Sequence, residues 1–147
     1  MKIISNETQI FHFPQGLPGF ETHHDFRFIP EEEAPLAHLI SVKEDKVGFI
    51  LLRPEAYFPE YLKEIDVAEE GIKVLNVNED MSVDVWVILT LHRQEMANTT
   101  VNLRAPILFN PTEGIGTQVI LNDDRYLTRQ LLFTPENPQP LQEGAVG

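Results

Sequence analysis

The chain has 147 residues, of which 42% are hydrophobic and 23% charged, with no cysteine and a formal net charge of −12. This length fits one domain with a sizeable core, and the composition is that of a globular protein, which excludes wholesale disorder. The absence of cysteine excludes disulfides and thiolate chemistry. No apolar run is long enough to cross a bilayer, and the amino-terminal residues lack the apolar segment of a secretory signal. We therefore expect a cytoplasmic protein with no membrane partner.

The acidic balance restricts the partners that the protein can bind. There are 23 Asp and Glu residues against 11 Lys and Arg residues, and no two basic residues are adjacent. Nucleic-acid binders gain affinity from clustered basic residues that neutralise phosphates, so we expect no direct binding to nucleic acid. The excess acid has two open interpretations: it keeps the protein in solution, or it accelerates encounter with a basic protein.

The first half of the chain predicts short strands separated by turns. The expected strands cover residues 9–13, 26–29, 36–42 and 47–53. The last two form a hairpin around a charged loop. Pro18 and Gly19 predict a type II turn, because proline supplies the fixed φ of the first central position and glycine the positive φ of the next.

One short helix is expected in the middle of the chain. Residues 54–61, rich in proline and aromatic residues, predict a connection. Asp66 and Glu69 then have the spacing of a capping box, so we expect a helix over residues 67–75, which Gly71 weakens.

Residues 83–92 give the clearest strand, because Val83, Val85, Val87, Leu89 and Leu91 occupy alternate positions on one face. On the opposite face, we expect Trp86 to be packed under the helix or the carboxyl-terminal tail instead of binding a ligand.

Three further strands are expected over residues 99–103, 107–109 and 117–121. Pro106 lacks an amide donor, which predicts an edge, a bend or a bulge between the first two. The pattern predicts a mainly β, single-domain, antiparallel β-barrel-like fold of about eight strands with one short helix over residues 1–133. Residues 134–147 are rich in proline and predict a flexible tail.

No set of side chains with catalytic or metal-binding spacing is found. The five histidines lack the spacing of zinc ligands, no serine lies in a Gly-x-Ser-x-Gly context, and Asn122–Asp124 is more typical of a turn than of a calcium loop. We expect no enzyme, no metal and no cofactor. Two alternatives stay open: a barrel that binds an oligosaccharide or small ligand, and a hydrolase with a pair of carboxylates. In the first, the cavity would be lined by Phe11, Phe13, Phe20, Phe26 and Phe28.

Charge is distributed unevenly along the chain. Between Pro54 and Asp84, nine acidic residues and two lysines give a local charge of −7, whereas residues 98–121 hold only Arg104 and Glu113 and are neutral. We expect one strongly negative surface and one almost uncharged β-rich surface, which allows two kinds of protein partner.

Three segments in this order resemble the flagellar assembly factor family FliW: Phe13–Glu21 (FPQGLPGFE), Thr100–Ile107 (TVNLRAPI) and Gln118–Leu121 (QVIL), followed by Tyr126. The resemblance extends from Met1 to about Phe133. It implies a small β-barrel-like fold and a non-enzymatic cytoplasmic regulator. Members of that family bind flagellin and the translational repressor CsrA, a small RNA-binding dimer. The resemblance implies that CsrA is antagonised allosterically until accumulating flagellin captures the factor.

The charge cluster and the resemblance together suggest partner-binding residues in a chain that we expect to be a monomer alone. The expected electrostatic contacts are Glu60, Glu64, Glu69, Glu70, Asp123 and Asp124. Tyr61 and Asn102 are expected as directed polar contacts. For Asn102, a role in stabilising a turn or a strand ladder is equally open.

Overall fold

The computed structural model describes residues 8–134 and has the mainly β fold that the sequence predicts. Its strands are β1 Gln9–His12, β2 Asp25–Pro30, β3 Leu36–Ser41, β4 Gly48–Leu52, β5 Asp84–Thr90, β6 Thr100–Val101, β7 Ile107–Asn110, β8 Ile115–Gln118 and β9 Gln130–Leu131. The helices are α1 Tyr61–Glu64 and α2 Glu69–Val74, with 3-10 turns η2 Pro54–Ala56 and η3 Met96–Asn98. The predicted tail lies outside the described residues, except for Thr134.

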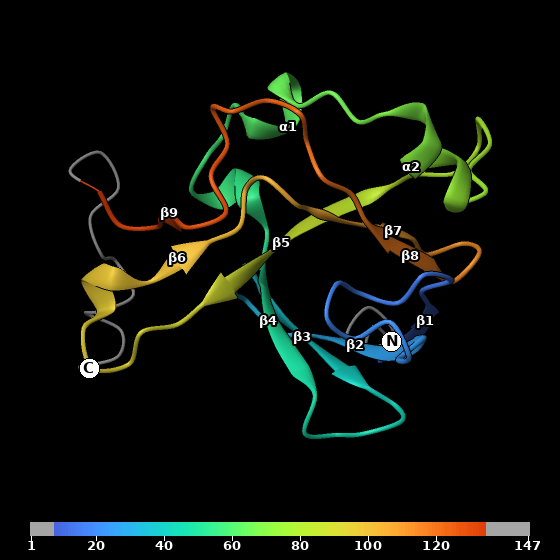
Figure 1. Ribbon diagram of the computed structural model, residues 1–147, viewed down its shortest axis with the longest axis horizontal. Helices are drawn as coiled ribbons and strands as arrows, with labels where there is room; N and C mark the ends of the chain where they lie inside the picture. The colour runs from blue at the N-terminus through green and yellow to red at the C-terminus, as the bar shows by residue number, and fades with distance from the viewer. Residues whose placement is uncertain (1–7, 135–147) are drawn as a thin grey trace.

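Seven strands close into a barrel in the order β4-β3-β2-β1-β8-β7-β5, and β5 pairs back with β4 to complete it. The described neighbours are antiparallel except β1 and β8, which pair in parallel at His12 and Ile115. β6 and β9 continue from β5 as a ribbon that extends away from the barrel (Figure 1). The barrel-like prediction is confirmed, with the short β9 and the parallel pair as differences.

Alternation along the strands separates two cores. β4 turns Leu51 into the barrel and Leu52 outward, and β5 does the same with Trp86 and Val87. The interior cluster comprises Phe11, Phe13, Leu17, Phe26, Ala37, Leu39, Leu51, Trp86, Ile107 and Phe109. Its rings meet edge to face, as in the pair Phe11 and Phe109, whose centroids are 4.7 Å apart. Of the phenylalanines considered as a cavity lining, Phe11, Phe13 and Phe26 therefore form part of the barrel core and Phe28 packs against it. Phe20 lies outside this cluster, with its ring against that of Phe49.

Trp86 is 2% exposed, which confirms that this side chain is packed. The Phe28 ring contacts it with centroids 5.2 Å apart, and the Arg53 guanidinium lies 4.5 Å from its ring centroid. Neither residue belongs to the predicted helix, because Trp86 is packed in the interior cluster and is not covered by the helix.

The second core lies outside the barrel, on the outer face of β4 and β5. It comprises Leu52, Tyr57, Tyr61, Val87, Leu89, Val101, Leu103, Leu121, Tyr126, Leu132 and Phe133. Its members come from the turn η2, from α1, from the β6 region and from the segments after β8. Burial of these apolar groups holds α1 and the loop between β8 and β9 against the barrel, where Figure 1 shows them at the same end.

The helical region differs from the prediction. The capping box is wrong: the chain is still extended at Ala68 (φ −61°, ψ 147°), which is the N-cap of α2 and forms no side-chain cap. α2 packs closely on the barrel, because a Cβ at Gly71 would lie 2.5 Å from Val119 Cγ1. A second helix, α1, begins where the sequence predicted the end of a connection. Within residues 8–134, no helix is long and apolar enough to span a membrane.

The Pro18–Gly19 turn is confirmed. The Phe20 amide donates a 2.7 Å hydrogen bond to the Leu17 carbonyl oxygen, and Gly19 has a φ of +86°. The turn holds Leu17, which is 1% exposed, in the interior cluster. The predicted interruption at Pro106 is also confirmed, since β6 ends at Val101 and β7 begins at Ile107.

Candidate functional site

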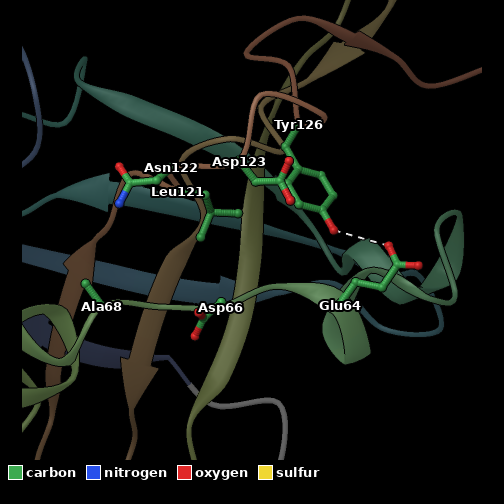
Figure 2. Close-up of a pocket in the computed structure, with 7 residues that line it drawn as sticks. All are labelled: Glu64, Asp66, Ala68, Leu121, Asn122, Asp123 and Tyr126. Atoms are coloured by element: carbon green, nitrogen blue, oxygen red, sulfur yellow. Dashed lines mark hydrogen bonds between the residues drawn. The ribbon is translucent and has the colours of Figure 1, made fainter.

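A pocket of about 480 Å³ opens where α1 meets the loop between β8 and β9. This acidic pocket is lined by Glu64, Asp66, Ala68, Leu121, Asn122, Asp123 and Tyr126 (Figure 2). Across 62 residues of sequence, the Tyr126 hydroxyl donates a 3.2 Å hydrogen bond to Glu64 Oε1. The rings of Tyr61 and Tyr126 pack nearly perpendicular to each other, with centroids 5.3 Å apart. Two segments that are distant in the sequence therefore form one site.

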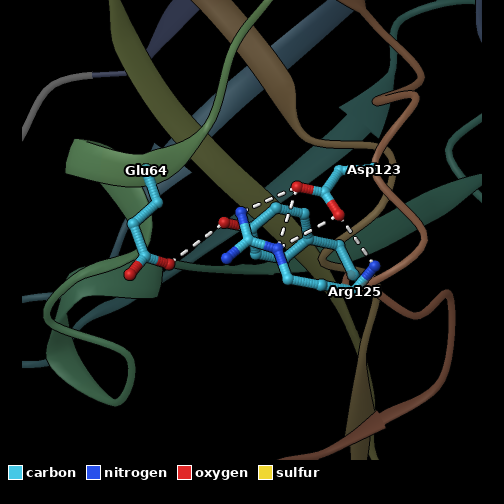
Figure 3. A network of polar contacts seen from close by, with 4 residues as sticks. Glu64, Asp123 and Arg125 are labelled. Atoms are coloured by element: carbon cyan, nitrogen blue, oxygen red, sulfur yellow. Dashed lines mark hydrogen bonds and ion pairs between the residues drawn. The ribbon is translucent and has the colours of Figure 1, made fainter.

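Arg125 is bound to Asp123 at the edge of the acidic pocket (Figure 3). Its Nε lies 3.0 Å from Oδ2 and 3.2 Å from Oδ1 of Asp123, and its Nη2 lies 2.7 Å from Oδ2. The Arg125 backbone amide donates a further 2.9 Å bond to Oδ1. The side-chain hydrogen bond from Arg125 is the largest cause that lowers the pKa of Asp123 below its ordinary value. Asp123 is therefore a carboxylate at neutral pH.

Tyr126 separates this ion pair from Glu64. Burial raises the pKa of Tyr126, and the hydrogen bond to Glu64 and the negative charge of that carboxylate raise it further. The phenol therefore stays neutral and donates at physiological pH. The guanidinium carbon of Arg125 lies 5.4 Å from the centroid of the Tyr126 ring.

Tyr61 has an internal role in the structure. Its side chain is 2% exposed, and its hydroxyl donates a 2.6 Å hydrogen bond to the Leu103 carbonyl oxygen. Burial is the largest cause that raises the pKa of Tyr61 far above its ordinary value, with a smaller contribution from Tyr126. The hydroxyl that the sequence suggested as a partner contact points into the protein, where it positions α1.

The other predicted acidic residues lie on the surface around α1, α2 and the loop. The Glu60 carboxylate lies 3.8 Å from Lys63 Nζ, and the Asp124 carboxylate, 93% exposed, accepts a 3.0 Å bond from Arg104. Glu69 and Glu70 are exposed at the start of α2, directly after a residue that lines the acidic pocket. The structure thus brings Glu64 together with Asp123 in the acidic pocket, and Glu60 lines a second hollow with Glu64. Asp124 instead pairs with Arg104, which lines the hollow around Asn102.

Asn102 belongs to a different surface. Its Oδ1 accepts hydrogen bonds from the backbone amides of Arg104 (3.1 Å) and Ala105 (3.0 Å), which is the turn-stabilising role that the sequence left open. It lines a separate hollow of about 340 Å³ with Gln118 and Ile120, among others. Ile120 is 68% exposed there, and Arg104 lines the same hollow, so this surface presents apolar and amide groups beside one cation.

Sequence reasoning did not identify Arg125 and Asp66 as part of the site. Asp66 was interpreted as a helix cap, and Arg125 carried no signal because its bond to Asp123 depends on the loop conformation. The sequence did give a signal for Tyr126, because this residue is among those that carry the family resemblance. In the described part of the chain, no group of three or more His, Asp and Glu residues is arranged to hold a metal ion. The arrangement of carboxylates beside tyrosine rings is suited to binding a cationic group.

Comparison with known proteins gives consistent matches. The family model described as FliW protein matches residues 1–132. "Flagellar assembly factor FliW" of Geobacillus thermodenitrificans is 38% identical over 128 residues, which are 87% of each chain. The protein of the same name from Bacillus pumilus is 39% identical over 127 residues, or 86% of each chain.

A solved structure agrees with these sequence matches. The crystal structure described as that of the flagellar assembly factor FliW superposes with a TM-score of 0.77 at 37% sequence identity, over 86% of each chain. Both the sequence and the fold therefore lead to one assignment: the chain belongs to the FliW family of flagellar assembly factors.

Proposed function

We propose that this FliW-family protein is a non-enzymatic, cytoplasmic regulator that binds flagellin and, alternately, the translational repressor CsrA. By binding CsrA at a surface away from its RNA site, the protein antagonises the repressor allosterically, so that flagellin mRNA is translated. Accumulating flagellin captures the protein and releases CsrA. Family membership supports the role in flagellar assembly, and the partners and the order of events are our proposal.

The observation that carries the proposal is the convergence of carboxylates from two distant segments. Glu64 and Asp66, at and just after α1, line one pocket with Asp123 of the loop before β9, and Glu60 lines a neighbouring hollow with Glu64, within a chain of net charge −12. A negative surface of this kind attracts a basic RNA-binding protein and raises the association rate. Glu69 and Glu70 extend this surface along α2.

The hollow around Asn102, which apolar and amide groups line together with Arg104, offers a second contact area. Ile120 is exposed there, next to the amide groups of Asn102 and Gln118 in the same hollow. Apolar and amide groups bind a partner without requiring positive charge. Two surfaces of different chemistry are what a protein with two partners needs.

The first experiment measures association of purified CsrA with the protein, using stopped flow at low ionic strength. The double variant Glu64→Lys/Glu69→Lys is expected to slow association by about tenfold or more, because steering contributes chiefly to the association rate. The matched control is Glu44→Lys/Asp45→Lys, which makes the same charge change on the distant β3–β4 loop. Equal effects of the two double variants would show that only net charge matters.

The second experiment titrates flagellin into the complex with CsrA. We expect CsrA to be released as flagellin binds, and RNA bound to CsrA to reappear in parallel. A stable complex that holds both partners at once would contradict alternate binding. Failure of both proteins to bind at low salt would overturn the proposed function.

A further inference from the structure

An apolar groove lies next to the acidic pocket and shares two of its residues. This aromatic groove of about 280 Å³ is walled by Phe58, Pro59, Leu103 and Tyr126, and its rim carries the carboxylates of Glu60 and Glu64. Glu64 and Tyr126 also line the acidic pocket. The two hollows therefore form one continuous surface, apolar on the side of Phe58 and acidic on the side of Asp123.

The negative charge of this surface favours a cationic occupant. A side chain with an apolar stem and a cationic head can lie along aromatic walls while its head reaches the carboxylates. A guanidinium suits the site better than an ammonium, because it stacks on a ring and forms a forked pair with a carboxylate. The occupant that fits is a segment of a protein partner in which an arginine lies next to an apolar residue.

Arg125 already makes the contacts that such an arginine would make. Its Nε and Nη2 bind the Asp123 carboxylate, with the shortest distance 2.7 Å, and its guanidinium lies over the Tyr126 ring. Its side chain is 65% exposed, so it can leave without opening the core. Asp123 would stay in place, because it also accepts a bond from the Arg125 backbone amide.

We propose that Arg125 occupies, in the free protein, the place of an arginine from a protein partner. When an arginine-bearing segment of the partner enters the aromatic groove, the partner's arginine displaces Arg125 from Asp123. The inference rests on the proposed function, because it takes the partner to be a basic protein. It adds the recognition chemistry of the site and an autoinhibitory contact that lowers the affinity of the free protein.

The test uses the full chain, labelled for NMR, and a defined probe: the acetylated and amidated tripeptide leucine-arginine-leucine. The control peptide has citrulline in place of arginine, which keeps the shape and removes the charge. Addition of the arginine peptide is expected to shift the signals of the Tyr126 ring, the Glu60 amide and the Arg125 Nε–H. The citrulline peptide is expected to leave them unchanged.

Arg125→Gln removes the competing guanidinium and is expected to bind the arginine peptide roughly twofold to fivefold more tightly, the range for loss of one exposed ion pair. Arg129→Gln makes the same charge change in the same loop and is expected to bind like the wild type. Asp123→Asn is expected to weaken binding in both the wild-type and the Arg125→Gln backgrounds, because it removes the carboxylate that both guanidiniums need.

The results for the inference and for the proposed function are separable. Absence of any shift at Tyr126 with the arginine peptide, or equal affinity of Arg125→Gln and Arg129→Gln, would overturn the inference even if CsrA binds. Conversely, tight peptide binding by Arg125→Gln together with failure of CsrA and flagellin to bind would leave the inference standing and remove the proposed partners.

Discussion

The Tyr61 hydroxyl donates a 2.6 Å hydrogen bond to the Leu103 carbonyl oxygen, which joins α1 to a segment 42 residues further along the chain. A four-residue helix is too short to be stable by itself. The Tyr61 side chain, almost fully buried in the outer core, therefore fixes the place of Glu60 and Glu64 on the surface.

Replacing Tyr61 with phenylalanine tests this anchor. Tyr61→Phe keeps the ring and leaves the Leu103 carbonyl without its donor in a buried place, so the free energy of unfolding should fall by about 1–3 kcal/mol. Urea unfolding of both proteins measures the difference. An unchanged free energy of unfolding in Tyr61→Phe would contradict the anchor.

Tyr61 should also make the stability of the protein depend on pH. Burial raises the pKa of Tyr61 in the folded state. Below the ordinary tyrosine pKa of about 10, Tyr61 is neutral in both the folded and the unfolded chain, so no stability is lost there. Above that pH the unfolded chain loses the proton and the folded chain keeps it. The free energy of unfolding should therefore fall by up to about 1.4 kcal/mol per pH unit from this group. Denaturant unfolding between roughly pH 9 and 12 should show a smaller slope in Tyr61→Phe.

A packing prediction concerns Gly116 of β8. A Cβ at Gly116 would lie 2.5 Å from Cζ of the Phe13 ring, which is fully buried in the barrel. Gly116→Ala should therefore lower the free energy of unfolding by about 2–3 kcal/mol through overpacking. Gly19→Ala is the control, because its Cβ would meet no atom within 4 Å and only the positive φ opposes it. Thermal unfolding should show a larger loss for Gly116→Ala, and the reverse order would refute the packing argument.

Asn110, at the end of β7, should be a strong determinant of stability. It is fully buried, and its Nδ2 donates a 2.8 Å hydrogen bond to the Leu75 carbonyl oxygen at the end of α2. Its Oδ1 accepts from the backbone amide of Thr112 at 3.1 Å. Asn110→Ala leaves these buried groups unpaired, which should lower the free energy of unfolding by about 2–4 kcal/mol.

The control for Asn110 is Asn78→Ala, which removes one exposed bond from the Asp80 amide to the Asn78 side chain. Chemical unfolding should show a change of under about 1 kcal/mol for this variant. Comparable losses in the two variants would mean that the buried bonds of Asn110 contribute no more than an exposed turn.

The sequence alone determined the features that depend on neighbours in the chain. Alternation in β5 predicted a strand, and Pro18 with Gly19 predicted the turn before Phe20, because each pattern restricts backbone torsions within a few residues. The motif series from Phe13 to Tyr126 indicated the family, which the comparisons confirm over residues 1–132. Net charge likewise follows from composition.

Only the tertiary structure determined which residues that are distant in the sequence contact each other. α2 begins at Glu69 with Ala68 still extended, not at the helix start that the spacing of Asp66 and Glu69 predicts, and it packs so closely on Val119 that Gly71 leaves no room for a Cβ. The bond between Tyr126 and Glu64 spans 62 residues, so no local pattern could indicate it. Tyr61 became an internal anchor and Asn102 a turn residue because burial and the available backbone partners depend on the closed barrel and its outer core. Those long-range contacts form only when the whole chain folds, so a local sequence pattern cannot predict them.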